Sequence, residues 1–362
     1  MKRYYQDDAV TIYQADALDM LRSLPDSSVD LIATDPPFYR VKDEPWDRAW
    51  DAPEAFLAWI GELCEQWQRV LAPNGSLYVF ASVEMAARVE VEIRRRFNVL
   101  NSIRWAKPAH STKAEMNPKE WQRCYFPTSE AIVFAEHFGA DNMAKGEAGY
   151  VAKCDELRGF VFEPLRAYLD GERVRAGFTA GDCNEACGNQ MAGHYFTRSQ
   201  WTLPTSENYA KLRALFNRGG AEYLRKEYEY LRKEYEELRK EYEELRRPFA
   251  LTPQDAYTDV WTFPTVGSYH GKHPCEKPPE MARHIVKASS REGGTVLDCF
   301  CGSGVFLAEA VAMGRKAIGC DALDRWVETS KQRCTKAERG EAWTMGGKSV
   351  GVEALPGQGT LW

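Results

Sequence analysis

The sequence predicts an α/β fold built on a mostly parallel sheet of seven strands, with helices on both faces. Seven segments have the apolar character of buried strands, and helical stretches such as 55–71 and 83–97 lie between them. Strands that alternate with helices are typical of parallel sheets. The expected strands are Thr11–Asp16, Ser28–Asp35, Ser76–Phe80, Val99–Ala106, Ala131–Glu136, Thr295–Phe300 and Lys316–Asp321.

One expected strand ends in a carboxylate that is followed by two prolines and an aromatic ring. The tetrapeptide Asp35-Pro36-Pro37-Phe38 comes directly after the apolar run Val29–Thr34. The prolines fix φ and remove two N–H donors, so nearby carbonyl groups remain free to accept hydrogen bonds. A carboxylate, a proline carbonyl and a ring suit a planar base that carries an exocyclic amine. A plain strand-to-loop turn is the alternative interpretation of so short a motif.

A glycine-rich turn connects another expected strand to a helix. The strand Thr295–Phe300 runs into Gly302-Ser303-Gly304, and a helical stretch follows over 305–313. Glycines at this place let a ligand approach the backbone at the carboxyl end of a strand. The next strand ends in Asp321, about 20 residues after the turn, where an acid can hold ribose hydroxyls.

Together these motifs resemble the amino-group DNA methyltransferases of the β class, in which the catalytic motif precedes the cofactor motif. Asp35-Pro36-Pro37-Phe38 is similar to the catalytic motif of that family, and Phe300-x-Gly302-x-Gly304 is similar to its S-adenosylmethionine loop. The segment His273–Pro278 resembles the His-Pro-x-x-Lys-Pro segment that opens the helix before that loop. The resemblance covers roughly 4–137 and 258–338.

Two shorter segments extend the resemblance. Gln14–Leu18 resembles the N-terminal segment whose Asp contacts the cofactor adenine, and Ser129–Phe134 resembles a late strand of the family. The resemblance implies a Rossmann-like catalytic domain made of 1–137 and 258–338, with the C-terminal cofactor strands at the centre of the sheet beside the N-terminal strands. It also implies a cytoplasmic protein of bacterial or phage origin that takes S-adenosylmethionine as cofactor.

The implied reaction is site-specific methylation of adenine N6 in double-stranded DNA, on a base flipped out of the duplex because its amine is unreachable inside it. The implied catalytic residues are Asp35, Pro36, Pro37 and Phe38. The implied cofactor-binding residues are Asp16, Asp35, His273, Lys277, Pro278, Asp298, Phe300, Gly302, Ser303, Gly304 and Asp321.

Three alternatives stay open at the level of function. Methylation of cytosine N4 uses the same chemistry, although that group typically has Ser at the position of Asp35. Enzymes that methylate glutamine N5 are a second alternative, and they typically have Asn at the position of Asp35. A DNA-binding regulator with a decayed catalytic domain is a third alternative, and the intact Asp35, Phe38 and loop glycines argue against it.

The region 138–218 is expected to be an inserted helical domain, and the resemblance implies that it recognises the target, because the family places its target-recognition region in this gap. Its expected helices are Pro164–Arg175, Thr179–Ala186, Gln190–Arg198 and Asn208–Phe216. A short helix, a turn at Gly188 and a second short helix suggest a helix-turn-helix, whose second helix enters the major groove. The candidate DNA-reading residues are Asn189, Gln190, His194, Arg198, Ser199 and Gln200. An ordinary helical subdomain with a polar surface is the alternative.

The segment 219–247 carries a heptad repeat. Leucines recur every seven residues at 224, 231, 238 and 245, and tyrosines recur at 228, 235 and 242, so that they form one a/d stripe. The pattern predicts a helix from Ala221 to Arg247 whose stripe packs on a partner. The first expectation for this partner is a second copy of the chain in a homodimer, and the second is another part of the same chain. A solvated helix held by i,i+4 ion pairs is the alternative.

The C-terminal segment 339–362 is rich in glycine and is expected to be flexible. It ends with Gln358, Leu361 and Trp362 in a pattern that resembles the short peptides bound by the bacterial sliding clamp. The chain has 362 residues, enough for two domains. Its net charge of −6 argues mildly against a nucleic-acid partner, although local basic patches decide DNA binding.

Ten cysteines at irregular spacings, without a signal peptide, indicate a cytoplasmic protein with reduced thiols. Cys154, Cys183, Cys187 and His194 fit no strong zinc pattern, and Cys183 and Cys187 at i,i+4 are typical of the buried face of a helix, so no metal site is predicted. No stretch is long and apolar enough to span a membrane.

Overall fold

The computed structural model describes residues 2–108, 123, 125, 127–137, 157–198, 200–345 and 348–350. The chain divides into two compact units. Unit 1 consists of Met1–Ala140 and Arg247–Trp362, and unit 2 is Asp141–Arg246. In the described part of the chain, no helix combines the length and the apolar character that a membrane crossing requires.

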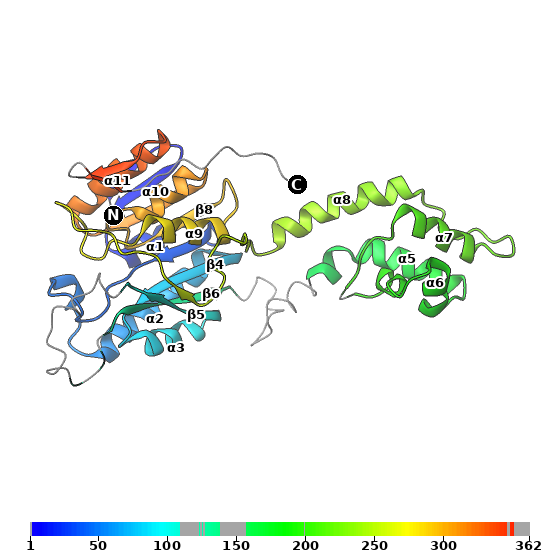
Figure 1. Ribbon diagram of the computed structural model, residues 1–362, viewed down its shortest axis with the longest axis horizontal. Helices are drawn as coiled ribbons and strands as arrows, with labels where there is room; N and C mark the ends of the chain where they lie inside the picture. Colours follow the sequence, from blue (N-terminus) through cyan, green and yellow to red (C-terminus); the bar gives the residue numbers. More distant parts are fainter. Residues whose placement is uncertain are drawn as a thin grey trace. The chain divides into compact units, whose positions relative to one another are not determined.

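A mixed sheet of nine strands forms the centre of unit 1 (Figure 1). In sheet order the strands are β1 (Lys2–Gln6), β2 (Val10–Gln14), β9 (Lys316–Asp321), β8 (Thr295–Asp298), β3 (Val29–Thr34), β4 (Leu71–Ala81), β6 (Ser129–Glu136), β5 (Asn98–Ala106) and β7 (Val260–Trp261). The five strands from β2 to β4 run parallel, while β1 and β6 pair antiparallel to their neighbours.

All seven segments expected to be strands lie in this sheet, but the strand count is corrected from seven to nine. The two additions are the edge strands β1 and β7. The first has charged and polar ends instead of an apolar run, and the second is only two residues long, so neither gives the pattern of a buried strand. The C-terminal strands β8 and β9 lie between β2 and β3, which confirms their predicted central place.

Helices cover both faces of the sheet, and each face has its own apolar core (Figure 1). On one face lie α1 (Ala17–Ser23), α2 (Pro53–Val70) and α3 (Ala86–Arg94). On the other lie α9 (Pro279–Ser289), α10 (Val305–Ala312) and α11 (Asp324–Glu338). Successive side chains of β3 point to opposite faces of the sheet, so Ile32 packs in the first core and Leu31 in the second.

Unit 2 is helical and has an apolar core of its own. Its helices are α5 (Glu163–Arg175), α6 (Ala180–Cys187), α7 (Ser206–Phe216) and α8 (Tyr228–Leu245). Helix α6 begins at a capping box in which Thr179 and Asp182 bond each other's backbone, and it ends at Gly188 in the left-handed conformation. Cys183 and Cys187 both face the core, as the i,i+4 spacing predicts.

The second helix of the predicted helix-turn-helix is absent from the described residues of unit 2. In place of a helix over Gln190–Arg198, the chain forms one turn of 3₁₀ helix, η5 (Ala192–Tyr195). Side chains compete with helix formation here, because Asn184 accepts from the Gly193 N–H and Asn189 accepts from the Met191 N–H. The helix-turn-helix prediction is therefore wrong, and Ser199 lies outside the described residues.

Helix α8 begins seven residues later than the heptad pattern predicts, at Tyr228 instead of Ala221. Leu224 has φ of 51° and donates its backbone N–H to the buried carboxylate of Glu172, which holds the preceding segment out of helical conformation. The apolar stripe packs inside unit 2, where Leu231 and Tyr242 are buried. The stripe thus has an intramolecular partner, which was the second of the two predicted arrangements.

The start of the C-terminal segment is ordered, which corrects the prediction of a flexible tail from 339 onward. Strands β10 (Trp343–Met345) and β11 (Lys348–Val350) pair antiparallel as a separate two-stranded sheet. Trp343 is buried and packs beneath the guanidinium of Arg333, whose charge lies 5.5 Å from the ring centroid. The clamp-like residues Gln358, Leu361 and Trp362 lie outside the described residues.

Candidate active site

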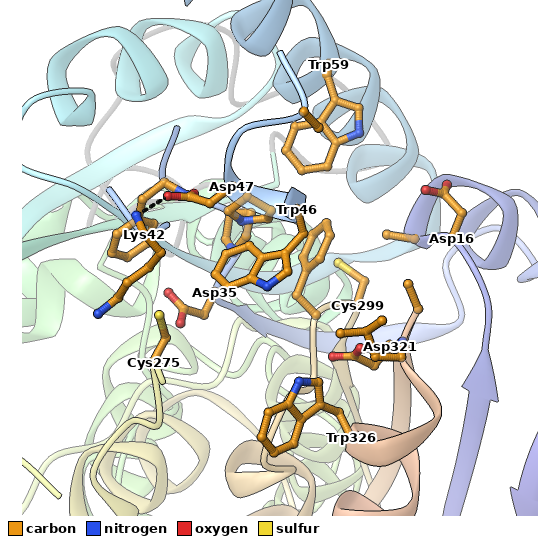
Figure 2. A pocket seen from close by; sticks show the side chains of 18 of the residues that line it. Asp16, Asp35, Lys42, Trp46, Asp47, Trp59, Cys275, Cys299, Asp321 and Trp326 are labelled. Carbon is orange, nitrogen blue, oxygen red and sulfur yellow. Dashed lines mark hydrogen bonds between the residues drawn. The ribbon is translucent and has the colours of Figure 1, made fainter. Parts of the chain in front are cut away.

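A cavity of about 300 Å³ lies at the carboxyl ends of four adjacent parallel strands of unit 1 (Figure 2). Strand β2 leads to Asp16, β3 leads to Asp35, β8 leads to Phe300, and β9 ends at Asp321. This edge is where open α/β sheets bind their ligands. The sheet order therefore brings motifs from both ends of the sequence to one place.

Two carboxylates stand at one end of the cavity in Figure 2, Asp16 and Asp321. Asp16 caps helix α1 and accepts hydrogen bonds from the Leu18 and Asp19 N–H groups. Asp321 accepts from the Gly302 N–H at 3.1 Å and from the Leu323 N–H at 2.9 Å. Burial raises the pKa of Asp321 above its ordinary value. Both side chains are fixed by backbone donors and are placed to accept from a polyhydroxylated ligand.

Asp35 stands at the other end of the cavity and is followed on its wall by Pro36, Pro37 and Phe38. Its Oδ2 atom accepts from the Lys277 ammonium at 2.5 Å. Among the residues that the structure describes, none donates to the buried Oδ1 atom. Burial raises the pKa of Asp35 to about 6 despite the nearby Lys277. Oδ1 of Asp35 is thus a buried acceptor to which no described residue of the chain donates.

Aromatic side chains form much of the remaining wall. Trp46, Trp50, Trp59, Phe300 and Trp326 all line the cavity. Trp59 packs on Trp50 with ring centroids 4.6 Å apart and on Phe300 at 5.6 Å. Such flat apolar surfaces suit planar heterocyclic groups.

The loop that follows Phe38 is held over the cavity by a single buried carboxylate. Asp47 accepts three backbone hydrogen bonds, from the N–H groups of Phe38, Val41 and Lys42, each at 2.6 Å. Asp47 is fully buried and ends the 3₁₀ turn η1 (Pro45–Asp47). Between Phe38 and Val41 the chain bends through Tyr39 and Arg40, which have φ of 64° and 61°. Left-handed backbone at two consecutive non-glycine residues requires such tertiary support.

Several residues expected to bind the cofactor support the cavity wall without lining it. Asp298 is buried, accepts from Thr34 Oγ1 at 2.9 Å and the Phe300 N–H at 3.1 Å, and has its pKa raised to about 7 by burial. The other expected residues absent from the lining are Lys277, Pro278, Gly302, Ser303 and Gly304. Pro278 precedes helix α9 as its N-cap.

The two loop glycines are required by packing in this structure. Gly302 and Gly304 have φ of 47° and 72°, in the left-handed region that favours glycine. A Cβ on Gly304 would lie 2.7 Å from the Ser330 Cα on helix α11, and a Cβ on Gly302 would lie 3.0 Å from the His273 ring. We expected these glycines to make room for a ligand, whereas here they let the loop pack against α11 and His273.

His273 does line the cavity, as expected, with its ring edge against Trp326 at a centroid distance of 4.5 Å. Burial lowers its pKa to about 3, so it is neutral at physiological pH. The segment that carries it is held by Glu276, which forms a buried ion pair with Arg333 at 2.8 Å. His273 therefore acts as an uncharged wall residue.

The sequence interpretation missed Asp47, the tryptophans at 46, 50 and 59, and the charges of Glu130 and Lys107 that lie behind Asp35. A usable signal existed for the tryptophans, because three of them follow the catalytic motif within a short stretch. No such signal existed for Glu130, which falls in the segment Ser129–Phe134 that resembles a late strand of the family and has no feature there that indicates a role in the site. The candidate DNA-reading residues lie in unit 2, where Gln190, Arg198 and Gln200 are exposed while Asn189 and His194 are half-buried.

Comparison with known proteins finds a match to the family model described as DNA methylase, which covers the N6 and N4 methyltransferases, over residues 29–332. The DNA adenine methyltransferase YhdJ of Escherichia coli K12 is 23% identical over 334 residues, which cover 91% of this chain and 84% of the relative. The type II methyltransferase M2.LlaDCHI of Lactococcus lactis subsp. cremoris is 22% identical over 356 residues, which cover 92% and 93% of the two chains.

Among solved structures, the cytosine-N4-specific PvuII DNA methyltransferase aligns with a TM-score of 0.50 at 12% identity. The alignment covers 94% of this chain and 96% of that chain. At this level of identity the similarity supports the fold alone.

Proposed function

Because the chain belongs to the DNA methylase family of N6 and N4 methyltransferases, we propose that it methylates N6 of adenine at specific sites in double-stranded DNA. Amino-group methylation of DNA follows from family membership, and the methyl donor is S-adenosylmethionine. The choice of adenine over cytosine is our proposal. It is supported by the carboxylate at position 35, and by the similarity to a relative named as an adenine methyltransferase.

The acceptor groups and the aromatic surfaces of the cavity suit S-adenosylmethionine. Asp16 and Asp321 are placed to accept hydrogen bonds from ribose and adenine groups, and the aromatic wall offers faces for a purine. When bound, S-adenosylmethionine supplies an electrophilic methyl group on a sulfonium sulfur, and the carbon–nitrogen bond forms as the carbon–sulfur bond breaks. Transfer of this kind depends on orientation, so the rigidity of the wall contributes to the rate.

The Oδ1 atom of Asp35, a buried acceptor to which no described residue donates, carries the proposal. It accepts a hydrogen bond from the target amine, and the Pro36 carbonyl accepts the second amine hydrogen. This draws the nitrogen lone pair out of conjugation with the ring, which makes the nitrogen nucleophilic. With a pKa of about 6, Asp35 is ionised at neutral pH and can receive the proton that the nitrogen loses.

The target base has to leave the duplex, because its amine cannot reach Asp35 within a base-paired stack. Phe38 and the tryptophans of the wall are proposed to receive the flipped base. For unit 2 we propose a role in target recognition through its exposed polar residues Gln190, Arg198 and Gln200. We further propose that the chain forms a homodimer and contacts the sliding clamp through the C-terminal residues Gln358, Leu361 and Trp362.

The test is the identity of the methylated nucleoside. Purified protein is incubated with unmethylated genomic DNA and S-adenosylmethionine that carries a deuterated methyl group, and the DNA is digested to nucleosides for mass spectrometry. We expect the label in N6-methyldeoxyadenosine. Label in N4-methyldeoxycytidine would replace the adenine assignment, and absence of label from all nucleosides would reject the activity.

A further inference from the structure

The candidate catalytic carboxylate of Asp35 is the end of a row of four charged side chains of alternating sign. Lys107 forms an ion pair with Glu130, Glu130 Oε2 lies 3.3 Å from the Lys277 ammonium, and Lys277 lies 2.5 Å from Asp35 Oδ2. The side chains of Lys277, Asp35 and Glu130 are 3%, 12% and 15% exposed. Two cations and two anions balance, so the buried row has no net charge.

Lys277 is at the centre of this row and is held firmly. Its ammonium also donates to the Cys275 carbonyl at 3.3 Å and lies over the rings of Phe38 and Phe80, at 5.2 Å and 4.9 Å from their centroids. Burial opposes the charge of Lys277, but Asp35 and Glu130 together raise its pKa above the ordinary value, so it stays protonated. The resemblance implied a cofactor-binding role for Lys277, yet Lys277 does not line the cavity and binds Asp35 instead.

The consequence for Asp35 is geometric. One of its two oxygens is occupied by Lys277, and the other is buried without a donor among the described residues. A carboxylate held in this way cannot rotate to offer the wrong oxygen without losing a buried ion pair. Loss of one member of such a pair leaves an uncompensated buried charge, which is strongly unfavourable.

We propose that Lys277 and Glu130 are positioning residues of the methyl-transfer site: Lys277 binds Asp35 Oδ2 so that Oδ1 alone receives the target amine, and Glu130 holds Lys277 in place. This inference rests on the proposed function, because it assigns how the same carboxylate is oriented and kept ionised. It separates Lys277 from the cofactor and places it with the reacting amine.

The proposal predicts opposite effects for the two neighbours of Asp35. The charged and titratable groups that face Asp35 are Lys277, Glu130 and Lys107, together with Asp298 and Cys275. Removal of the Lys277 charge leaves burial and the Glu130 charge, both of which disfavour the ionised form of Asp35. Removal of the Glu130 charge takes away the repulsion by a neighbouring anion, while Lys277 still favours the ionised form of Asp35.

The experiment compares Lys277→Met and Glu130→Gln by the pH dependence of kcat/KM, whose acid limb reports the free enzyme. We expect a limb near pH 6 in the wild type, a move to higher pH by about 1–3 pH units in Lys277→Met, and a move to lower pH in Glu130→Gln. For a move of two pH units, kcat/KM at pH 7 falls about tenfold. The dissociation constant of S-adenosylmethionine, measured by calorimetry, should stay within about threefold in both variants.

Two further variants serve as controls. Lys277→Arg keeps the charge and should restore the wild-type limb in part. Lys287→Met makes the same Lys-to-Met change away from the site, on helix α9. Lys287 is about half exposed and pairs with Asp255 at 3.1 Å, so this variant should leave the acid limb of the pH profile unmoved.

The outcomes separate this inference from its alternatives. A weaker affinity of Lys277→Met for S-adenosylmethionine with an unmoved limb would assign Lys277 to the cofactor and overturn the proposal. A lower plateau in both variants, without opposite moves, would reduce both residues to a structural role. If the wild type transfers no methyl group, the proposed function fails, while titration of ¹³C-labelled Asp35 by NMR in the same variants still tests the orientation by Lys277.

Discussion

The buried carboxylate of Asp47 accepts a hydrogen bond from the Phe38 N–H at 2.6 Å and so ties the end of the proposed catalytic motif, Asp35–Phe38, to the loop that follows it. The same carboxylate holds Val41 and Lys42 through their backbone N–H groups. Tyr39 and Arg40 adopt their left-handed conformation between these points. Asp47 therefore holds the end of the proposed catalytic motif and the following loop in their conformation through these backbone hydrogen bonds.

We predict that Asp47→Ala lowers both stability and activity. Each of the three N–H groups that lose their acceptor costs about 1–3 kcal/mol if it stays buried, and the loop opens where it does not. The free energy of unfolding in urea and kcat measure the two effects. Asp43→Ala is the control, because Asp43 lies in the same loop, is exposed and pairs only with Arg48 in the described structure. Equal behaviour of the two variants would refute the role of Asp47.

We predict that Gly304→Ala destabilises unit 1 more than Gly293→Ala does. Both glycines have positive φ, 72° and 77°, so both substitutions meet a left-handed backbone penalty of about 1–2 kcal/mol. Only at 304 would the new Cβ also lie 2.7 Å from the Ser330 Cα, whereas at 293 no described atom lies within 4 Å. Urea unfolding of both variants measures the difference, and equal midpoints would show that the loop tolerates a side chain at 304.

We predict that Leu231→Glu unfolds or loosens unit 2 without any change in the oligomeric state. Leu231 is fully buried in the core of unit 2, and a buried charge without a partner costs several kcal/mol. Tyr230→Glu, on the exposed side of the same helix, should have little effect. Thermal unfolding and light scattering are measured together. A loss of mass in Leu231→Glu at unchanged thermal stability would instead place the heptad stripe in a dimer interface.

We predict that Arg198→Ala weakens DNA binding or relaxes sequence choice without a change in affinity for S-adenosylmethionine. The side chain is 73% exposed and its ion pair with Glu163, at 3.3 Å, leaves donors for DNA. A base contact should cost about 1–3 kcal/mol of discrimination, and a phosphate contact should reduce the salt dependence of binding. Arg232→Ala on α8, with a similarly exposed arginine paired to Glu229, is the control. Identical DNA binding by the two variants would remove Arg198 from the interface.

The sequence was sufficient to predict seven of the nine strands and the edge of the sheet at which the cavity lies. Buried strands leave apolar runs, and residues such as Asp35 and Asp321 stand directly after such runs, so their common place at the carboxyl edge follows from parallel pairing. The central place of β8 and β9 came from family resemblance, because nothing in the periodicity of the chain determines strand order.

The remaining features depend on contacts between distant residues, which no local pattern encodes. Lys277 and Asp35 are 242 positions apart, and their pairing appears only in the folded chain. The heptad pattern predicted a helix from 221, but the bond between the Leu224 N–H and Glu172 holds that segment in another conformation. The expected recognition helix was similarly replaced by one 3₁₀ turn, because asparagine side chains bond its backbone.

The most direct test of this account is the single-turnover rate of methyl transfer by Asp35→Ala, measured beside its affinity for S-adenosylmethionine. The account predicts a loss of at least about 100-fold in rate, the order of effect seen when a group that stabilises the transition state is removed. It also predicts a dissociation constant for S-adenosylmethionine close to that of the wild type, because Asp16 and Asp321 stand at the other end of the cavity. A folded Asp35→Ala variant that methylates DNA within a few-fold of the wild-type rate would contradict the assignment of Asp35 as the acceptor of the target amine.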